Sequence, residues 1–177
     1  MPHTARPAQK RFEPRNPDWE ATVRGSFARQ AVMSLIGAEM GALAPGHCEV
    51  RLPFRADLTQ QNGFFHAGIT STIVDSAGGY AGLTLMPAGS DVLTVEFKLN
   101  LLAPADGEYL VAEGQVLKTG RNLVIARGEV YAIRNGAATH CATMQQTLRR
   151  PRRGVEPFSS HPAGGNSSAR TPPTSRT

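Results

Sequence analysis

The sequence predicts an α+β fold in which an antiparallel sheet of about six strands wraps around one long central helix, with a further helix near the N-terminus. Three observations predict this fold. The segment from Ala67 to Leu85 is apolar or small on nearly every side, as a buried helix is. Strand patterns separated by turn signals lie on both sides of this segment. The segment from Val92 to Ala103 alternates apolar and polar residues, which is the period of a strand with one buried face.

The part of the chain before the central helix contains one helix pattern and two strand patterns. Apolar residues recur at helical spacing from Trp19 to Met33, so we expect an amphipathic helix there, capped by Asp18 or Asn16. A Pro-Gly turn separates the two strands that follow, and a loop leads into the central helix. We expect the strands at Gly37–Leu43 and His47–Phe54 and the loop at Asp57–Phe65.

Four strand patterns follow the central helix, and a turn signal separates each from the next. Pro104-Ala105-Asp106-Gly107 ends the first of them, and Asn135-Gly136 is a strong hairpin signal because both residues accept positive φ. The four expected strands are Val92–Ala103, Glu108–Lys118, Leu123–Arg134 and Ala137–Leu148. With the two earlier strands they form a sheet that can curl around a single apolar helix.

The central helix carries one charged residue, Asp75, in a stretch that otherwise reads as buried. At helical spacing, Ser71, Asp75, Gly78 and Gly82 share a narrow stripe with little side-chain bulk, so other backbone can approach it closely. A carboxylate in an apolar helix is costly unless it is paired, neutralised or used. Asp75 is therefore either a hydrogen-bonded core residue or a functional acid.

An amide-rich turn, Gln60-Gln61-Asn62-Gly63, leads into the start of the central helix. The N-terminus of a helix offers unpaired N–H groups and a partial positive charge, which suit a developing oxyanion. The side chains of His66 and Gln60 can add further donors. One short segment can therefore supply both a carboxylate, Asp75, and an oxyanion hole.

The net charge of +5 belongs to the end of the chain and not to the expected folded part. Residues 149–177 hold six arginines and one glutamate, whereas the rest of the chain carries 13 basic and 13 acidic residues. We expect a disordered leader over 1–17, a folded domain over 18–148 and a disordered basic tail over 149–177. A charge-balanced domain argues against nucleic acid as a partner.

Several features of the termini bear on where the protein works. The cluster Arg149-Arg150-Pro151-Arg152-Arg153 is typical of a solvated tail; contact with RNA, anionic lipid or an acidic partner is the alternative. A mitochondrial transit peptide is the alternative for the leader, which lacks an apolar face. We find no secretory signal and no apolar run of the roughly 20 residues that cross a bilayer. We therefore expect a cytoplasmic protein, with no membrane contact, whose Cys48 and Cys141 are buried.

The residues around the helix start also form a recognisable motif. Gly63 precedes His66-Ala67-Gly68 by three residues, and Asp75 lies nine residues after His66. The strand TVEFKLNLLAPA, which begins at Thr94, follows the helix. Over residues 35–148 this pattern resembles the hotdog-fold acyl-CoA thioesterases, in particular their PaaI-like branch. The resemblance implies a hotdog fold and the hydrolysis of acyl-CoA thioesters to a free acid and coenzyme A.

The resemblance also implies roles for individual residues. Asp75 would be the general base or nucleophile, and the backbone N–H of Ala67 would polarise the thioester carbonyl. His66 would hold the carbonyl or position water. The family has an asparagine where this chain has Gln60, and Gln61 or Asn62 can take its place. Thr94 would orient the attacking water across a subunit interface; it lies on the polar face of its strand, which is compatible with facing the partner's site.

In the resembling family the sites form between subunits, usually in dimers that pair into homotetramers. Ala67 and Asp75 are about two helical turns, roughly 11 Å, apart on one helix, which fits a site shared between two copies. The family places coenzyme A with its phosphates near the turn that corresponds to Gly120, Arg121 and Asn122, although Arg121 can equally be an ordinary turn residue. We expect no metal and no cofactor beyond the coenzyme A of the substrate.

Two other functions fit a hotdog fold. A non-catalytic acyl-CoA-binding protein, such as a ligand sensor, is the main alternative, but it has no need of a buried acid such as Asp75. A hydratase is the other, and its Asp and His pattern is absent from the sequence. The acyl chain stays open, because Phe64, Phe65 and Tyr80 can line an aryl or medium-chain pocket or belong to the core.

Overall fold

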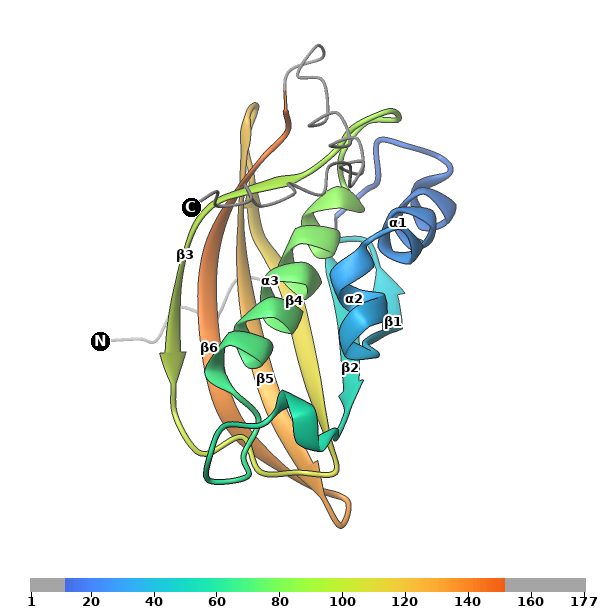
Figure 1. The fold of residues 1–177 in the computed structure, drawn as a ribbon. Coiled ribbons are helices and arrows are strands. Elements are labelled where there is room, and N and C mark those ends of the chain that lie inside the picture. Colours follow the sequence, from blue (N-terminus) through green and yellow to red (C-terminus); the bar gives the residue numbers. More distant parts are fainter. Residues whose placement is uncertain (1–11, 152–177) are drawn as a thin grey trace, which may run out of the picture.

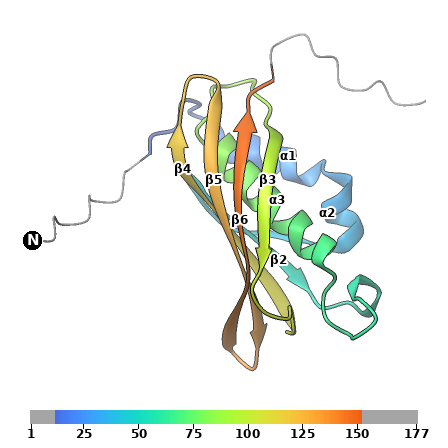
Figure 2. The ribbon, with the colours of Figure 1, turned by 90° about the vertical axis from the view of Figure 1, so that its left-hand side faces the viewer.

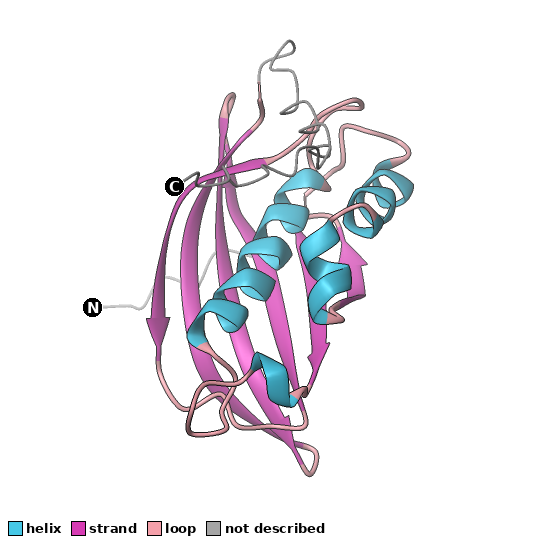
Figure 3. Ribbon diagram, viewed as in Figure 1, coloured by secondary structure: helices cyan, strands magenta, loops and turns pink. Residues whose placement is uncertain are grey.

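The computed structural model describes residues 12–151 of the 177-residue chain. One sheet curves around one long helix, and two short helices lie on the same side of the sheet as that helix (Figures 1 and 3). The helices are α1 (Trp19–Ala28), α2 (Ala31–Ile36) and α3 (Ala67–Leu83), with a single 3-10 turn, η1, over Ala56–Leu58. The predicted α+β architecture, a sheet wrapped around a central helix, is confirmed.

The sheet has six strands in the order β1-β2-β4-β5-β6-β3, and all neighbours are antiparallel. The strands are β1 (Glu39–Ala44), β2 (His47–Pro53), β3 (Leu93–Leu101), β4 (Tyr109–Thr119), β5 (Leu123–Arg134) and β6 (Ala137–Arg149). Figure 2 shows β4, β5, β6 and β3 side by side, with the helices behind them. Every expected strand is present, and β1 and β3 form the two edges of the sheet.

Helix α3 is buried along most of its length because its small residues let the sheet approach closely. A Cβ atom placed on Gly78 would lie 2.3 Å from the side-chain oxygen of Gln146 on β6. A Cβ atom on Gly82 would lie 2.6 Å from the side chain of Leu148 on the same strand. The predicted close approach at the glycine stripe is therefore confirmed, and β6 is the element that uses it.

The single amphipathic helix expected from Trp19 to Met33 is wrong, since the structure divides this region into α1 and α2. Gln30 separates them with an extended backbone, φ −77° and ψ 95°. The break redirects the chain so that Met33 and the following Ile36 are both buried in the core. Continuous helical spacing cannot reveal such a break, because each half is helical by itself.

Strand β3 contains an irregularity in its pairing with β6, between Thr94 and Glu96. Thr94 lies opposite Leu148, and Phe97 lies opposite Gln146. Residues directly opposite each other in an antiparallel pair share a face, so the bulge places Thr94 on the same inner face as Phe97. The strict alternation of the sequence predicted that Thr94 lies on the outer polar face. This prediction is wrong because the bulge turns Thr94 to the inner face.

The described residues begin before the expected domain start at Asp18. Asn16 is buried, and its side chain donates to the Thr22 hydroxyl at 2.9 Å and accepts from the Asp18 N–H at 3.0 Å. Phe12 packs against the core. The rest of the expected leader and most of the basic tail lie outside the described residues. Within residues 12–151, none of the helices is both long and apolar enough to cross a membrane.

Candidate active site

The side chain of Asp75 projects from the middle of α3 toward the edge of the sheet, where it meets Thr94 of β3. The Thr94 hydroxyl donates to Asp75 Oδ1 at 2.7 Å. Burial raises the pKa of the Asp75 carboxyl above its ordinary value, and the Thr94 hydrogen bond offsets part of that rise. The sequence paired these two residues only through a family resemblance, and the structure brings them together within one chain.

A second donor, Gln146 of β6, contacts Asp75 from the sheet and was not among the predicted site residues. Its Nε2 donates to the Asp75 backbone carbonyl at 3.2 Å and lies 3.4 Å from Oδ1. Seventy-one positions separate the two residues in the sequence. The available signal was a polar residue at an inward position of an otherwise apolar strand pattern.

The N-terminus of α3 is built from local contacts. His66 is the N-cap, and its Nδ1 accepts a hydrogen bond from the Gly68 N–H at 2.9 Å. Because Nδ1 accepts, the ring carries its proton on Nε2, which leaves that N–H as a donor. Within residues 12–151, no hydrogen bond engages the backbone N–H of Ala67. Among the described residues, two donors at the helix start therefore have no partner: the ring N–H of His66 and the backbone N–H of Ala67.

Gln60 lies in the turn before α3, close to this helix start in the chain. Its backbone N–H donates to the Phe64 carbonyl at 2.9 Å, and its carbonyl accepts from the Gly63 N–H at 2.9 Å. Gly63 adopts φ +82°, which glycine permits without strain. The side-chain oxygen of Gln60 accepts from the Asn62 N–H, so its amide group is fixed with only its NH₂ as a free donor.

The aromatic residues near the site divide between the core and the surface. Phe65 and Tyr80 are buried in the core, Phe65 in edge contact with Phe54 and Tyr80 in edge contact with Phe27. Phe64 is half-buried in the turn before the helix. The core interpretation therefore holds for Phe65 and Tyr80, which leaves Phe64 as the aromatic side chain available near the helix start.

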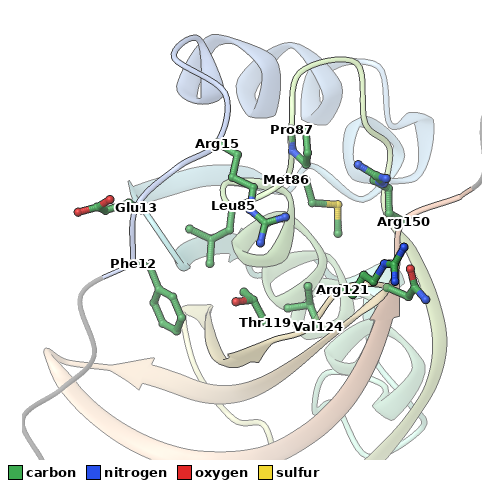
Figure 4. A pocket seen from close by; sticks show the side chains of 12 residues that line it. Phe12, Glu13, Arg15, Leu85, Met86, Pro87, Thr119, Arg121, Val124 and Arg150 are labelled. Carbon is green, nitrogen blue, oxygen red and sulfur yellow. The ribbon is translucent and has the colours of Figure 1, made fainter.

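A separate basic cavity of about 240 Å³ lies beyond the C-terminal end of α3 (Figure 4). The β4–β5 turn contributes Gly120, Arg121 and Asn122 to it, as well as Thr119. Arg15, Arg150 and Glu13 line the same cavity, so its wall carries three guanidinium groups and one carboxylate. Sequence reasoning selected the turn but missed Arg15, which fell within the expected leader, and treated Arg150 only as part of a tail.

These groups together can perform acyl chemistry. A partly buried carboxylate with a raised pKa can take a proton from water or attack a carbonyl carbon. A helix N-terminus with a free N–H and a ring donor can stabilise the oxyanion that results. A cavity lined by three arginines can hold phosphate groups.

Comparison with known proteins supports this chemistry. A family model described as the thioesterase superfamily matches residues 62–138. A solved thioesterase family protein from Silicibacter pomeroyi is 48% identical with a TM-score of 0.74, over 75% of this chain and 97% of that one. A protein of Saccharolobus solfataricus that is named an esterase is 31% identical over 114 residues, which cover 64% of this chain and 73% of the relative.

Two further solved structures share the fold. A Bacillus halodurans protein solved with CoA is 25% identical with a TM-score of 0.63, over 76% of this chain and 92% of that one. The PaaI protein of E. coli is 15% identical with a TM-score of 0.68, over 78% of this chain and 96% of that one. The predicted resemblance to hotdog-fold thioesterases is confirmed, and the likeness to the PaaI protein shows a shared fold.

Proposed function

Because this chain belongs to the hotdog-fold thioesterase superfamily, we propose that it hydrolyses acyl-CoA thioesters to a free acid and coenzyme A. Thioester hydrolysis follows from the family; the acyl-CoA substrate and the residue roles are the proposal. The observation that carries it is the Asp75 carboxylate, which is partly buried, has no cation beside it among the described residues and is held by a hydroxyl donor. Partial burial without a paired cation does not stabilise a structural aspartate, whereas it raises the pKa of a general base.

In the proposed reaction, the Asp75 carboxylate takes a proton from a water molecule, and the oxygen of that water attacks the thioester carbonyl carbon. The Ala67 N–H and the His66 ring N–H donate to the carbonyl oxygen as it becomes an oxyanion. When the carbon–sulfur bond breaks, the proton on Asp75 passes to the sulfur of the leaving coenzyme A. Thr94 keeps the carboxylate oriented through Oδ1. If Asp75 is the nucleophile instead of the general base, its carboxylate attacks the carbonyl carbon directly.

The site is proposed to form between two copies of the chain. Ala67 and Asp75 lie about two helical turns, roughly 11 Å, apart, so one acyl carbonyl cannot contact both within one chain. The edge strand β3 carries apolar side chains on both of its faces that are 46–57% accessible, so this edge of the sheet is suited to pairing with a second copy. These side chains are Leu93, Val95, Phe97 and Leu101. The assembly is proposed to be a dimer or a homotetramer built from two dimers.

The basic cavity is proposed to hold the phosphate groups of coenzyme A. Arg15, Arg121 and Arg150 supply the positive charge, and the turn residues Gly120 and Asn122 shape the wall. The Bacillus halodurans structure with CoA supports a coenzyme A ligand for a protein of this fold. Arg121→Ala is expected to raise KM for an acyl-CoA about tenfold, because a charge-assisted hydrogen bond is lost, and to leave KM for the matching acyl-pantetheine unchanged. An equal effect on both substrates would contradict this assignment.

Release of free thiol from short, medium, long and aryl acyl-CoAs tests the function directly. We expect at least one class to be turned over by the full-length protein. Binding of acyl-CoA without any turnover would overturn hydrolysis and favour the ligand-sensor alternative. A protein that neither binds nor hydrolyses any acyl-CoA would overturn the substrate assignment as a whole.

A mixing experiment tests whether the site is shared. Asp75→Asn removes the base, and Ala67→Pro removes the N–H at the first helical position, where proline is tolerated after the extended His66. Each variant alone is expected to be inactive. After subunit exchange at equal amounts, mixed dimers carry one intact site, so about a quarter of the wild-type rate should return. No recovery, in a mixture shown by mass spectrometry to contain mixed dimers, would place the site within one chain.

A further inference from the structure

Gln146 is a polar residue in a position that the rest of its strand fills with apolar side chains. It is 1% exposed and lies on the inner face of β6. The neighbouring inward positions of the same strand are Met144 and Leu148, which are also fully buried. Because Leu148 packs on Gly82 as Gln146 packs on Gly78, a leucine or methionine at position 146 would fit the same kind of space.

The amide of Gln146 makes its hydrogen bonds with Asp75 alone among the described residues. Nε2 donates to the Asp75 backbone carbonyl at 3.2 Å, which fixes the amide against α3, and the same nitrogen lies 3.4 Å from Oδ1. The amide oxygen Oε1 is buried and has no hydrogen-bond partner within residues 12–151. A buried acceptor without a donor destabilises a fold, so packing alone does not account for a glutamine here.

The surroundings of the Asp75 carboxylate are otherwise simple. Strand β3 presents the Thr94 hydroxyl, strand β6 presents the Gln146 amide, and no other ionisable side chain in the described chain pairs with the carboxylate. Both donors meet Oδ1, and no described residue donates to Oδ2. The carboxylate is thus held by one oxygen, and the other oxygen is left for a water molecule or a substrate.

We infer that Gln146 is a positioning residue of the active site, which holds the Asp75 carboxylate with Oδ1 toward the sheet and Oδ2 toward the reacting groups. Gly78 is required for this arrangement, because any side chain there would displace the Gln146 amide. The inference rests on the proposed function only in treating Asp75 as the base. The placement of the carboxylate by Gln146 is a separate claim that can be measured without a substrate.

The variant Gln146→Met tests the inference, with Leu148→Met as a matched control on the same face of the same strand. Methionine fills the space of glutamine but donates no hydrogen bond, and it removes the unpartnered Oε1. We therefore expect Gln146→Met to fold and to be at least as stable as the wild type. Its kcat is expected to fall about tenfold with little change in KM, as loss of a bond to a charged group predicts. Gln146→Leu is the second replacement, with the same expectation.

Two readouts separate positioning from packing. The acid limb of the kcat profile is expected to move to higher pH in Gln146→Met, because the ionised carboxylate loses a donor and its pKa rises. The same rise is expected in a carbon-13 NMR titration of the Asp75 carboxyl, which needs no substrate. Leu148→Met is expected to move neither value.

Each outcome decides one of the two claims. An Asp75 titration that is the same in Gln146→Met, Gln146→Leu and wild type would overturn the inference, whatever the rates show. An equal shift in Leu148→Met would overturn it as well, since general packing would then be the cause. A wild-type protein that hydrolyses no thioester, while Gln146→Met still raises the Asp75 pKa, would overturn the proposed function and leave the positioning role intact.

Discussion

The N-terminus and the middle of α3 both carry residues of the proposed site, but the protein builds the two regions in different ways. At the N-terminus, the His66 ring caps the helix through Gly68, two residues along the chain, and Gln60 bonds to Asn62 at the same separation. In the middle, Asp75 depends on Thr94, 19 residues away, and on Gln146, 71 residues away. The donor half of the site is a local structure, and the carboxylate half is a product of the whole fold.

This difference follows from the chemistry that each half needs. Helix N–H groups are unpaired wherever a helix begins, so a short turn can present them to an oxyanion. A base with a raised pKa requires burial, and burial requires strands from elsewhere in the chain. Replacements in the middle of α3 should therefore alter the rate and its pH dependence. Replacements at the start of α3 should alter either the stability of the helix, through its cap, or the rate, through the donors, and the two effects can be separated.

The replacement Asp75→Asn is expected to have the largest effect. Loss of the general base should lower kcat by about 10²- to 10⁴-fold. The fold should persist, because the asparagine oxygen can still accept from Thr94 and Gln146. Burial raises the Asp75 pKa in the folded state, so the folded protein loses stability as pH rises from the unfolded value through the folded value. Asp75→Asn should accordingly be at least as stable as wild type at pH 7 in urea denaturation; a clear loss of stability would make Asp75 a structural residue.

The replacement Thr94→Val comes next. It removes the hydroxyl that donates to Oδ1 at 2.7 Å and keeps the shape of the side chain. That bond lowers the Asp75 pKa, so its loss should raise the pKa, move the acid limb of the rate profile to higher pH and reduce kcat by about 10- to 100-fold.

A matched control for Thr94 lies on the outer face of the same strand pair. The hydroxyl of Thr147 donates to Glu96 Oε1 at 2.8 Å in an exposed position. Thr147→Val removes a bond of the same kind and should leave the rate profile unchanged. Equal effects of the two replacements would show that the strand pairing matters and the contact with Asp75 does not.

Two adjacent glycines of α3, Gly78 and Gly79, offer a third test, for which we expect smaller effects. Alanine at Gly78 would place its methyl group 2.3 Å from Gln146 Oε1, whereas nothing lies within 4 Å of a Cβ on Gly79. Overpacking costs typically 1–3 kcal/mol, and alanine gains about 1 kcal/mol over glycine in a helix. Gly78→Ala should therefore lose about 1 kcal/mol in urea denaturation and lose activity as Gln146 moves. Gly79→Ala should gain about 1 kcal/mol and keep its activity; the reverse ranking would contradict the packing described for β6.

The same division explains what the sequence could predict. Strand patterns repeat every two residues and helix patterns every 3.6 residues, so the spacing of apolar and small residues predicted the six strands, α3 and its glycine stripe. The residues proposed for the donor half of the site, His66, Ala67 and Gln60, lie within a few residues of the helix start, so a local motif was enough to select them as candidates. Cys48 and Cys141 are buried and free, as expected from their spacing.

Features that depend on tertiary contacts could not be predicted from the sequence. The bulge before Glu96 turned Thr94 to the inner face, and a period-two pattern has no means of showing it. The break at Gln30 is set by what α1 and α2 pack against, and helical spacing continues through it. Gln146 became a candidate only when the sheet placed it on Asp75. Arg15 joined the basic cavity for the same reason.

Replacements of His66 give the sharpest division between capping and chemistry. His66→Ala loses both the helix cap and the ring donor, so it should cost about 0.5–2 kcal/mol of stability as well as activity. His66→Asn keeps a side-chain acceptor for the Gly68 N–H and should retain wild-type stability in urea denaturation, while its rate stays as low as that of His66→Ala. Recovery of the rate in His66→Asn would mean that the ring N–H contributes nothing to the reaction and that His66 only caps α3. The donor half of the site would then consist of the Ala67 N–H and the amide of Gln60.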